Sequence, residues 1–161
     1  MKQRAGKPDV QTPMPAEDRL EGFIAKFTAQ VAQQTRQALS VMRARLPSAL
    51  VLVYDNYNAL AIGFGPNECA GDAILSLAVF PRWVSLFFLQ GVGLPDPAGL
   101  LKGTGNTARH IVLKDVAMLS EKPVQDLIDA ALAAARVKLP ASGSGSLVIK
   151  SISAKQRPRR P

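Results

Sequence analysis

A short run near residue 100 concentrates the side chains that could bind a ligand. The stretch LLKGTGNTARHIVL, residues 100–113, holds one lysine, two glycines, one arginine and the only histidine of the chain. Glycine and asparagine tolerate a positive φ, so this loop could present backbone N–H groups to an anion, with Lys and Arg side chains beside them. We therefore expect a small anionic ligand to be held by six residues: Lys102, Gly103, Gly105, Asn106, Arg109 and His110.

The same run matches a loose dinucleotide-binding pattern. GTGNTA, residues 103–108, has the form G-x-G-x-x-G/A. That pattern binds a pyrophosphate only where it connects a strand to the N-terminus of the next helix. Here the pattern is expected to lead from a helix into a strand, so we interpret the match as a coincidence and expect no cofactor.

Arg109 poses a question of burial. In a strand it alternates with His110 and shares a face with Ile111 and Leu113, so it should be partly buried. A buried guanidinium needs acceptors, and a structural acceptor is favoured over a ligand. The candidates are Asp55, Asp72, Asp115, a backbone carbonyl, or the anionic group of a ligand.

Nothing in the sequence supplies a catalytic constellation. His110 has no serine or cysteine nucleophile, paired carboxylate or second histidine identifiable as its partner, so a structural role is favoured for it. Cys69 is the single cysteine, which excludes an internal disulfide. A binding or accessory protein is therefore expected ahead of an enzyme, with no catalytic and no metal-ligating residue assigned.

The positive charge is concentrated toward the two ends of the sequence. The net charge is +8, divided as +4 over residues 1–46, −1 over 47–140 and +5 over 141–161. A basic tail can contact phosphates without sequence preference. The alternative function is therefore binding of nucleic acid or an acidic partner through Lys150, Lys155, Arg157, Arg159 and Arg160. The competing interpretation is a solvated, disordered end that only keeps the protein soluble.

No segment resembles a membrane anchor or a secretory signal. Bilayer spans need roughly 20 apolar residues, which no run here approaches. The start MKQRAGKPDVQTPMPAEDR has no apolar stretch behind its basic residues. The sequence predicts a cytoplasmic protein, and association of two copies through exposed strand surface stays compatible with every interpretation.

The pattern of apolar residues predicts the elements that would position these side chains. Residues 1–15 read as a flexible leader, and spacings of three and four predict one long amphipathic helix from about Pro15 to Pro47. Two hairpins should follow, ALVLVY with ALAIGFG and AILSLAVF with VSLFFLQ. The later elements are a short helix in LPDPAGLLKG capped by Asp96, a strand ARHIVLK, a helix over about 122–137 capped by Ser120, a flexible joint ASGSGS and an edge strand LVIKSIS before the tail.

This order predicts a single α+β domain over residues 16–140. Connections as short as residues 55–58 cannot make parallel crossovers. The expected fold is an antiparallel sheet of about five strands packed against two amphipathic helices, a two-layer sandwich. Residues 141–161 would add the joint, the edge strand and the basic tail.

The run WVSLFFLQGVGLPDPAGLLKGTGNTARHIVL, residues 83–113, resembles the YdhG-like family of bacterial domains of unknown function. The similarity extends from VAQQTRQALSVMRARLP, residues 31–47, to VQDLIDAALAAA, residues 124–135. The tail LVIKSISAKQRPRRP resembles one branch of that family. The resemblance implies a compact α+β fold with an antiparallel sheet, similar to that of frataxin, and no established catalytic residues.

Part of that family is linked to frataxin-like iron handling, which depends on clustered carboxylates on the first helix and adjoining strand. The sequence departs from this pattern, because the first helix has no acid beyond Glu21 and is otherwise basic. The nearby candidates for oxygen ligands are Asp55, Glu68 and Asp72. Iron chaperoning is therefore the weakest of the functions that the sequence suggests.

Overall fold

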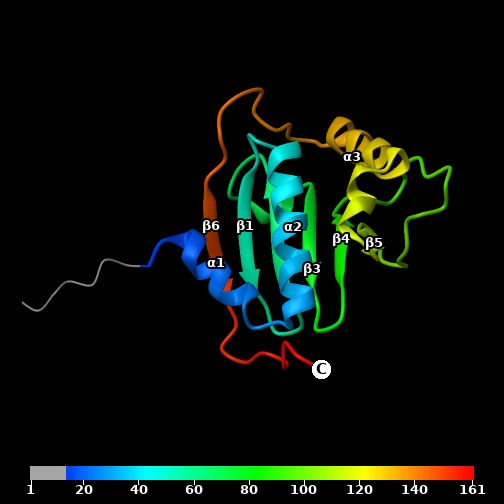
Figure 1. The fold of residues 1–161 in the computed structure, drawn as a ribbon. Coiled ribbons are helices and arrows are strands. Elements are labelled where there is room, and N and C mark those ends of the chain that lie inside the picture. Colours follow the sequence, from blue (N-terminus) through cyan, green and yellow to red (C-terminus); the bar gives the residue numbers. More distant parts are fainter. Residues whose placement is uncertain (1–13) are drawn as a thin grey trace, which may run out of the picture.

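The computed structural model describes residues 14–161, so most of the predicted leader lies outside the described residues. These residues form three α-helices and one six-stranded sheet, arranged as Figure 1 shows. The elements are α1 (Ala16–Ile24), α2 (Ala29–Arg45), β1 (Leu50–Asp55), β2 (Leu60–Gly65), β3 (Leu75–Val79), β4 (Val84–Phe88), β5 (Arg109–Leu113), α3 (Lys122–Ala134) and β6 (Leu147–Ile152), with short 3₁₀ turns η1 (Ala70–Asp72) and η2 (Val116–Ser120).

The sheet is mixed, with the order β5-β4-β3-β2-β1-β6. Strands β1 to β5 form an antiparallel meander, which confirms the two predicted hairpins and the fifth strand. The last strand crosses the domain and pairs with β1 in parallel, with Val51 opposite Leu147. The expected antiparallel sheet of about five strands therefore gains a sixth, parallel strand, because a chain that returns past α3 reaches the open edge of β1 in the same direction.

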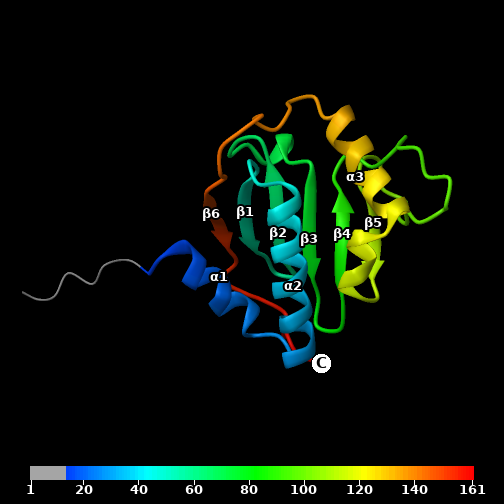
Figure 2. The same cartoon turned by 45° about the horizontal axis from the view of Figure 1, so that its top comes forward.

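All three helices lie on one face of the sheet, as both ribbon views show (Figures 1 and 2). Alternate strand residues point toward them and form a continuous apolar core. Its largest fully buried side chains include Phe27, Phe64, Phe88, Leu20, Ile24, Met42, Leu60, Ile62, Leu75, Leu77 and Leu86. The predicted two-layer arrangement is confirmed by this packing.

The single long helix predicted after Pro15 is wrong, because the chain forms two helices with a turn between them. Thr28 adopts an extended conformation, with φ −59° and ψ 156°, and its side chain accepts a hydrogen bond from the N–H of Val31. That cap begins α2. Phe27 in the turn is buried, so the apolar spacing of three and four continues across the break and hides it from a periodicity argument.

The short helix predicted around Asp96 is also absent from the described residues. The Asp96 carboxylate accepts hydrogen bonds from the N–H groups of Leu100 and Leu101, both at 2.9 Å. These contacts organise a loop in place of a helix, since a short polar side chain competes with backbone acceptors. Gly103, with φ +121°, therefore bends a loop and does not end a helix.

The later elements match the prediction more closely. Helix α3 begins at Lys122 with Pro123 in its first turn, but Glu121 precedes it and no side chain caps it. The predicted cap, Ser120, instead ends η2. Within residues 14–161, no helix combines the length and the apolar character needed to cross a bilayer.

The joint predicted as flexible in ASGSGS is hydrogen-bonded to the domain at its last two residues, Gly145 and Ser146. The N–H of Gly145 donates to the carbonyl of Pro47 at 3.0 Å, and the N–H of Val51 donates to the carbonyl of Ser146 at 2.9 Å. A Cβ on Gly145 would lie only 1.6 Å from the carbonyl oxygen of Ala49. The connection therefore needs glycine at this point, and it guides β6 onto the edge of β1.

Candidate ligand-binding site

The loop that the sequence singled out is braced by its own backbone. Lys102 and His110 form an isolated antiparallel bridge, with both N–H···O distances at 2.9 Å. The imidazole ring of His110 stacks on Phe87 at 4.9 Å between ring centres. The structure thus brings these two predicted residues together, while Gly103, Gly105 and Asn106 are exposed in the turn that joins them.

Arg109 uses part of its guanidinium within this loop. Its Nη1 donates to the carbonyl oxygens of Gly105 and Ala108, at 2.6 and 2.7 Å. Arg109 is half-buried and shares its face with Ile111 and Leu113, as strand alternation predicted. Of the acceptors that the sequence offers to the Arg109 guanidinium, the structure therefore uses backbone carbonyls. These hydrogen bonds tie the two ends of the 105–109 turn together.

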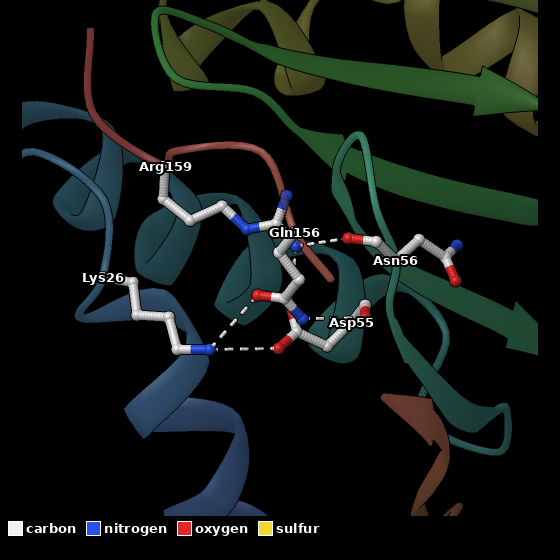
Figure 3. Close-up of polar contacts among 5 residues, drawn as sticks. All are labelled: Lys26, Asp55, Asn56, Gln156 and Arg159. Carbon is white, nitrogen blue, oxygen red and sulfur yellow. Dashed lines mark hydrogen bonds and ion pairs between the residues drawn. The ribbon is translucent and has the colours of Figure 1, made fainter. Parts of the chain in front are cut away.

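The most buried charge in the described residues is at the end of β1. Asp55 is fully buried, and its Oδ1 accepts from Nη2 of Arg159 at 2.9 Å while its Oδ2 accepts from Nζ of Lys26 at 3.3 Å. Gln156 donates to the backbone carbonyl of Asp55 at 3.0 Å, and Arg159 also donates to the carbonyl of Asn56 at 2.5 Å. Figure 3 shows the five residues converging from the α1–α2 turn, the end of β1 and the C-terminal segment.

These partners keep Asp55 ionised. Burial opposes the charge, but the donor groups of Gln156, Arg159 and Lys26 beside the carboxylate outweigh burial and hold the pKa of the Asp55 carboxyl below its ordinary value. The Arg159 guanidinium also lies over the ring of Phe27, at 5.6 Å from its centre. We call this arrangement of Lys26, Asp55, Gln156 and Arg159 the C-terminal clamp.

The basic tail is consequently folded onto the domain, which corrects the expectation of a solvated, disordered end. Arg159 is only 6 % exposed and serves the clamp, so it is not available to a nucleic acid. Lys150 lies on β6, 4.0 Å from Glu68, and Lys155 is exposed. Arg157 and Arg160 are exposed as well, on either side of the buried Arg159.

The folded tail completes a groove at one end of the sheet. The groove has a volume of about 690 Å³ and lies between the β3–β4 turn and the C-terminal segment. In both ribbon views this segment runs past the end of the sheet that carries the β1–β2 and β3–β4 turns (Figures 1 and 2). The lining residues are Asn58, Phe80, Pro81, Arg82, Trp83, Arg157, Pro158, Arg160 and Pro161.

The groove combines positive charge with an exposed aromatic surface. Arg82, Arg157 and Arg160 line it, and none of the nine described residues that line it has an acidic side chain. Trp83 stacks on Phe80, with 4.8 Å between ring centres and planes 20° apart, and remains 41 % exposed. Such an arrangement can bind anions through the guanidinium groups and a flat ring through the indole.

Another cavity, of about 410 Å³, lies beside the C-terminal end of α3. Its charged residues are already paired, because Arg136 donates to Asp72 at 3.0 Å. Hydrogen bonds from Asn67 and Arg136 lower the pKa of the Asp72 carboxyl. Among residues 14–161, no group of three histidine, cysteine or acidic side chains lies close enough together to hold a metal ion. We therefore take the arginine-lined groove as the candidate site.

No local pattern in the sequence predicts this groove. The charge of the tail predicts phosphate contacts by Arg157 and Arg160, but nothing in the sequence places Trp83 and Arg82 beside them. One feature of the sequence does point to the groove: Trp83 is the only tryptophan and lies in the turn PRW between two strands, where a large apolar side chain has little to pack against.

Comparisons with protein-family models, with curated proteins and with solved structures give no match to this chain.

Proposed function

We propose that this protein binds a ligand that carries both a phosphate group and a flat ring, as a nucleotide does, in the groove between the β3–β4 turn and the C-terminal segment. The observation that carries this proposal is the placement of three arginines beside the exposed indole of Trp83, with no acidic side chain among the residues that line the groove. This is a binding function and assigns no catalytic residue.

Each component of the groove suits one part of such a ligand. Arginine presents a planar fork of donors that matches phosphate oxygens, and it is always charged. Tryptophan supplies the ring face on which a base can stack. The net charge of +8 would in addition raise the rate at which an anionic ligand meets the protein.

The groove is favoured over the loop around Arg109 as the anion site. Two carbonyl oxygens already occupy Nη1 of Arg109, so an anion there would have to share or displace these contacts. The side chain of Arg82 enters no hydrogen bond or ion pair with another described residue. A free guanidinium gains more from a phosphate than one that is already bonded.

The single tryptophan makes the proposal directly testable. Titration with adenosine monophosphate should quench the fluorescence of Trp83, whereas adenosine and inorganic phosphate should each bind at least tenfold more weakly because each offers half of the contacts. Arg82→Gln should weaken binding of adenosine monophosphate about tenfold, as expected for one lost charged hydrogen bond.

Two control variants separate the sites. Arg136→Gln removes an exposed charge at the opposite end of the sheet and should leave the affinity unchanged. Arg109→Ala should also leave it unchanged if the groove is the site. Loss of binding in Arg109→Ala with no effect of Arg82→Gln would return the anion site to the 102–110 loop and contradict the proposal.

A further inference from the structure

We infer that the groove binds single-stranded nucleic acid over at least two successive nucleotides, in preference to a free nucleotide. This inference rests on the proposed function and deepens it. It comes from a second aromatic platform beside the groove and from an arginine that contacts this platform and also lines the groove.

The second platform is Tyr57, which is 48 % exposed on the β1–β2 turn. That turn lies next to the β3–β4 turn of Trp83, because β2 and β3 are paired and Leu60 at the start of β2 is opposite Val79 at the end of β3. Asn58, the neighbour of Tyr57, itself lines the groove with Trp83. Two exposed rings therefore stand on adjacent turns at the same end of the sheet.

Arg157 contacts the Tyr57 ring and also belongs to the groove of Trp83. Its guanidinium carbon lies 5.6 Å from the centre of the Tyr57 ring, and the same residue lines the groove with Trp83. Its backbone N–H donates to the carbonyl of Tyr57 at 2.9 Å, which fixes its position relative to the turn. A guanidinium beside one exposed ring, in a residue that lines the groove of the other, suits the alternation of phosphate and base along a single strand.

The groove also lacks the features that select one small molecule. Asn58 is the only lining side chain that offers both a hydrogen-bond donor and an acceptor for a base edge, while the other polar side-chain groups, the arginine guanidinium groups and the indole N–H of Trp83, only donate. Stacking and charge tolerate any base sequence. The expected ligand is therefore a strand bound with little sequence preference, and double-stranded nucleic acid, whose bases are already stacked, is excluded from both rings.

The test compares a fluorescently labelled deoxythymidine hexamer with thymidine monophosphate, using fluorescence anisotropy for the hexamer and Trp83 quenching for both. The hexamer should bind at least tenfold more tightly. Tyr57→Ala should weaken hexamer binding about tenfold and leave the monophosphate unaffected, and Tyr57→Phe should restore the hexamer affinity because the ring is what stacks. If three arginines contact phosphates, a plot of the logarithm of the hexamer association constant against the logarithm of the salt concentration should have a slope near −2.

Two further probes distinguish binding through stacked bases from binding through negative charge alone. A hexamer of abasic nucleotides and a hexaglutamate peptide should both bind at least tenfold more weakly than the deoxythymidine hexamer. Equal binding of the abasic hexamer would overturn the inference, and tighter binding of the peptide would identify an acidic polypeptide as the partner. Arg136→Gln serves as the matched charge control, and a thermal melt of each variant checks that the fold is retained.

The outcomes distinguish this inference from the proposed function. If thymidine monophosphate quenches Trp83 but the hexamer binds no more tightly and Tyr57→Ala has no effect, the inference fails and the groove remains a nucleotide site. If neither ligand binds, both fail together.

Discussion

Asp55 and Arg159 lie 104 residues apart in the sequence, and their side chains form a buried ion pair with 2.9 Å between Oδ1 and Nη2. The two side chains are 1 % and 4 % exposed. The pair joins the end of β1 to the segment that lines the groove, so it holds Arg157 and Arg160 at the groove wall. The C-terminal segment is thereby part of the folded domain and of its candidate site.

Replacing Asp55 should be strongly destabilising. Asp55→Asn leaves the buried charge of Arg159 without its counter-ion, which costs about 3 kcal/mol in comparable buried pairs. We expect a decrease of that size in the free energy of unfolding, measured by urea denaturation. Lys26→Met should cost much less, since the Lys26 side chain is 46 % exposed and solvent screens its interaction with Asp55.

A double-mutant cycle tests the pairing itself. Arg159→Met alone leaves Asp55 with Lys26, and Arg159→Met combined with Asp55→Asn should lose less than the sum of the two single changes. Additive losses would show that Asp55 and Arg159 stabilise the fold independently. The same variants should weaken nucleotide binding through a displaced Arg157, and a variant that still binds with full affinity would contradict the role of the clamp at the groove.

The clamp also predicts that the stability of the protein decreases at acidic pH. The pKa of Asp55 is lowered in the folded protein, so its contribution is fully present above the ordinary pKa of about 3.9 and is lost as the pH falls through the lower, folded value. The urea midpoint should therefore decrease steeply below about pH 4. Asp55→Asn should flatten this dependence, whereas Asp72→Asn should alter it less, because Asp72 pairs with a largely exposed arginine.

Two glycines provide a matched test of the connection into β6. Gly145→Ala would place a Cβ 1.6 Å from the carbonyl oxygen of Ala49, so the loop must move and stability should decrease by about 1–3 kcal/mol. Gly105→Ala meets no atom within 4 Å and should leave the melting temperature almost unchanged. Equal melting temperatures for the two variants would show that residues 141–146 are as loosely held as the sequence suggested.

Tyr54 offers a substitution that should not destabilise the protein. Its hydroxyl is buried and has no hydrogen-bond partner among the described residues, and burial, with a smaller effect of Cys69, raises its pKa. The unfolded chain therefore ionises first, and stability should fall as the pH rises above about 10. Tyr54→Phe should keep or raise the urea midpoint at pH 7 and reduce the alkaline loss. A clear loss of stability at pH 7 would indicate a polar contact at this hydroxyl.

The strands were the most predictable part of the fold. Short apolar runs such as ALVLVY and VSLFFLQ, bounded by turn residues, indicate buried strands, and turns such as PRW limit the strands to antiparallel pairs. The helices were harder to predict. Phe27 continues the apolar spacing across the break at Thr28, and the Asp96 carboxylate, expected to cap a helix, instead accepts hydrogen bonds within a loop. Both errors come from side chains that replace backbone hydrogen bonds.

The candidate site could be predicted only in part. The charge of Arg157 and Arg160 identifies them from the sequence, but the inward direction of Arg159 follows from neither a helical nor a strand period. Asp55 is one of the acceptors that the sequence offers to Arg109, and the structure pairs it with Arg159 instead. The groove joins the β1–β2 turn, the β3–β4 turn and the C-terminal segment, and contacts across such separations carry no local signal in one sequence.

The position of β6 has a consequence for the order in which the chain acquires its structure. During synthesis, β1 and its neighbours β2 to β5 can form a meander early, while the outer edge of β1 stays unpaired until β6 has been made and Asp55 lacks its ion-pair partner until Arg159 has left the ribosome. An open strand edge is a template for intermolecular pairing. Unfinished or truncated chains should therefore aggregate through the open edge of β1. The pairing of β6 with β1 should also be a slow, late step of folding.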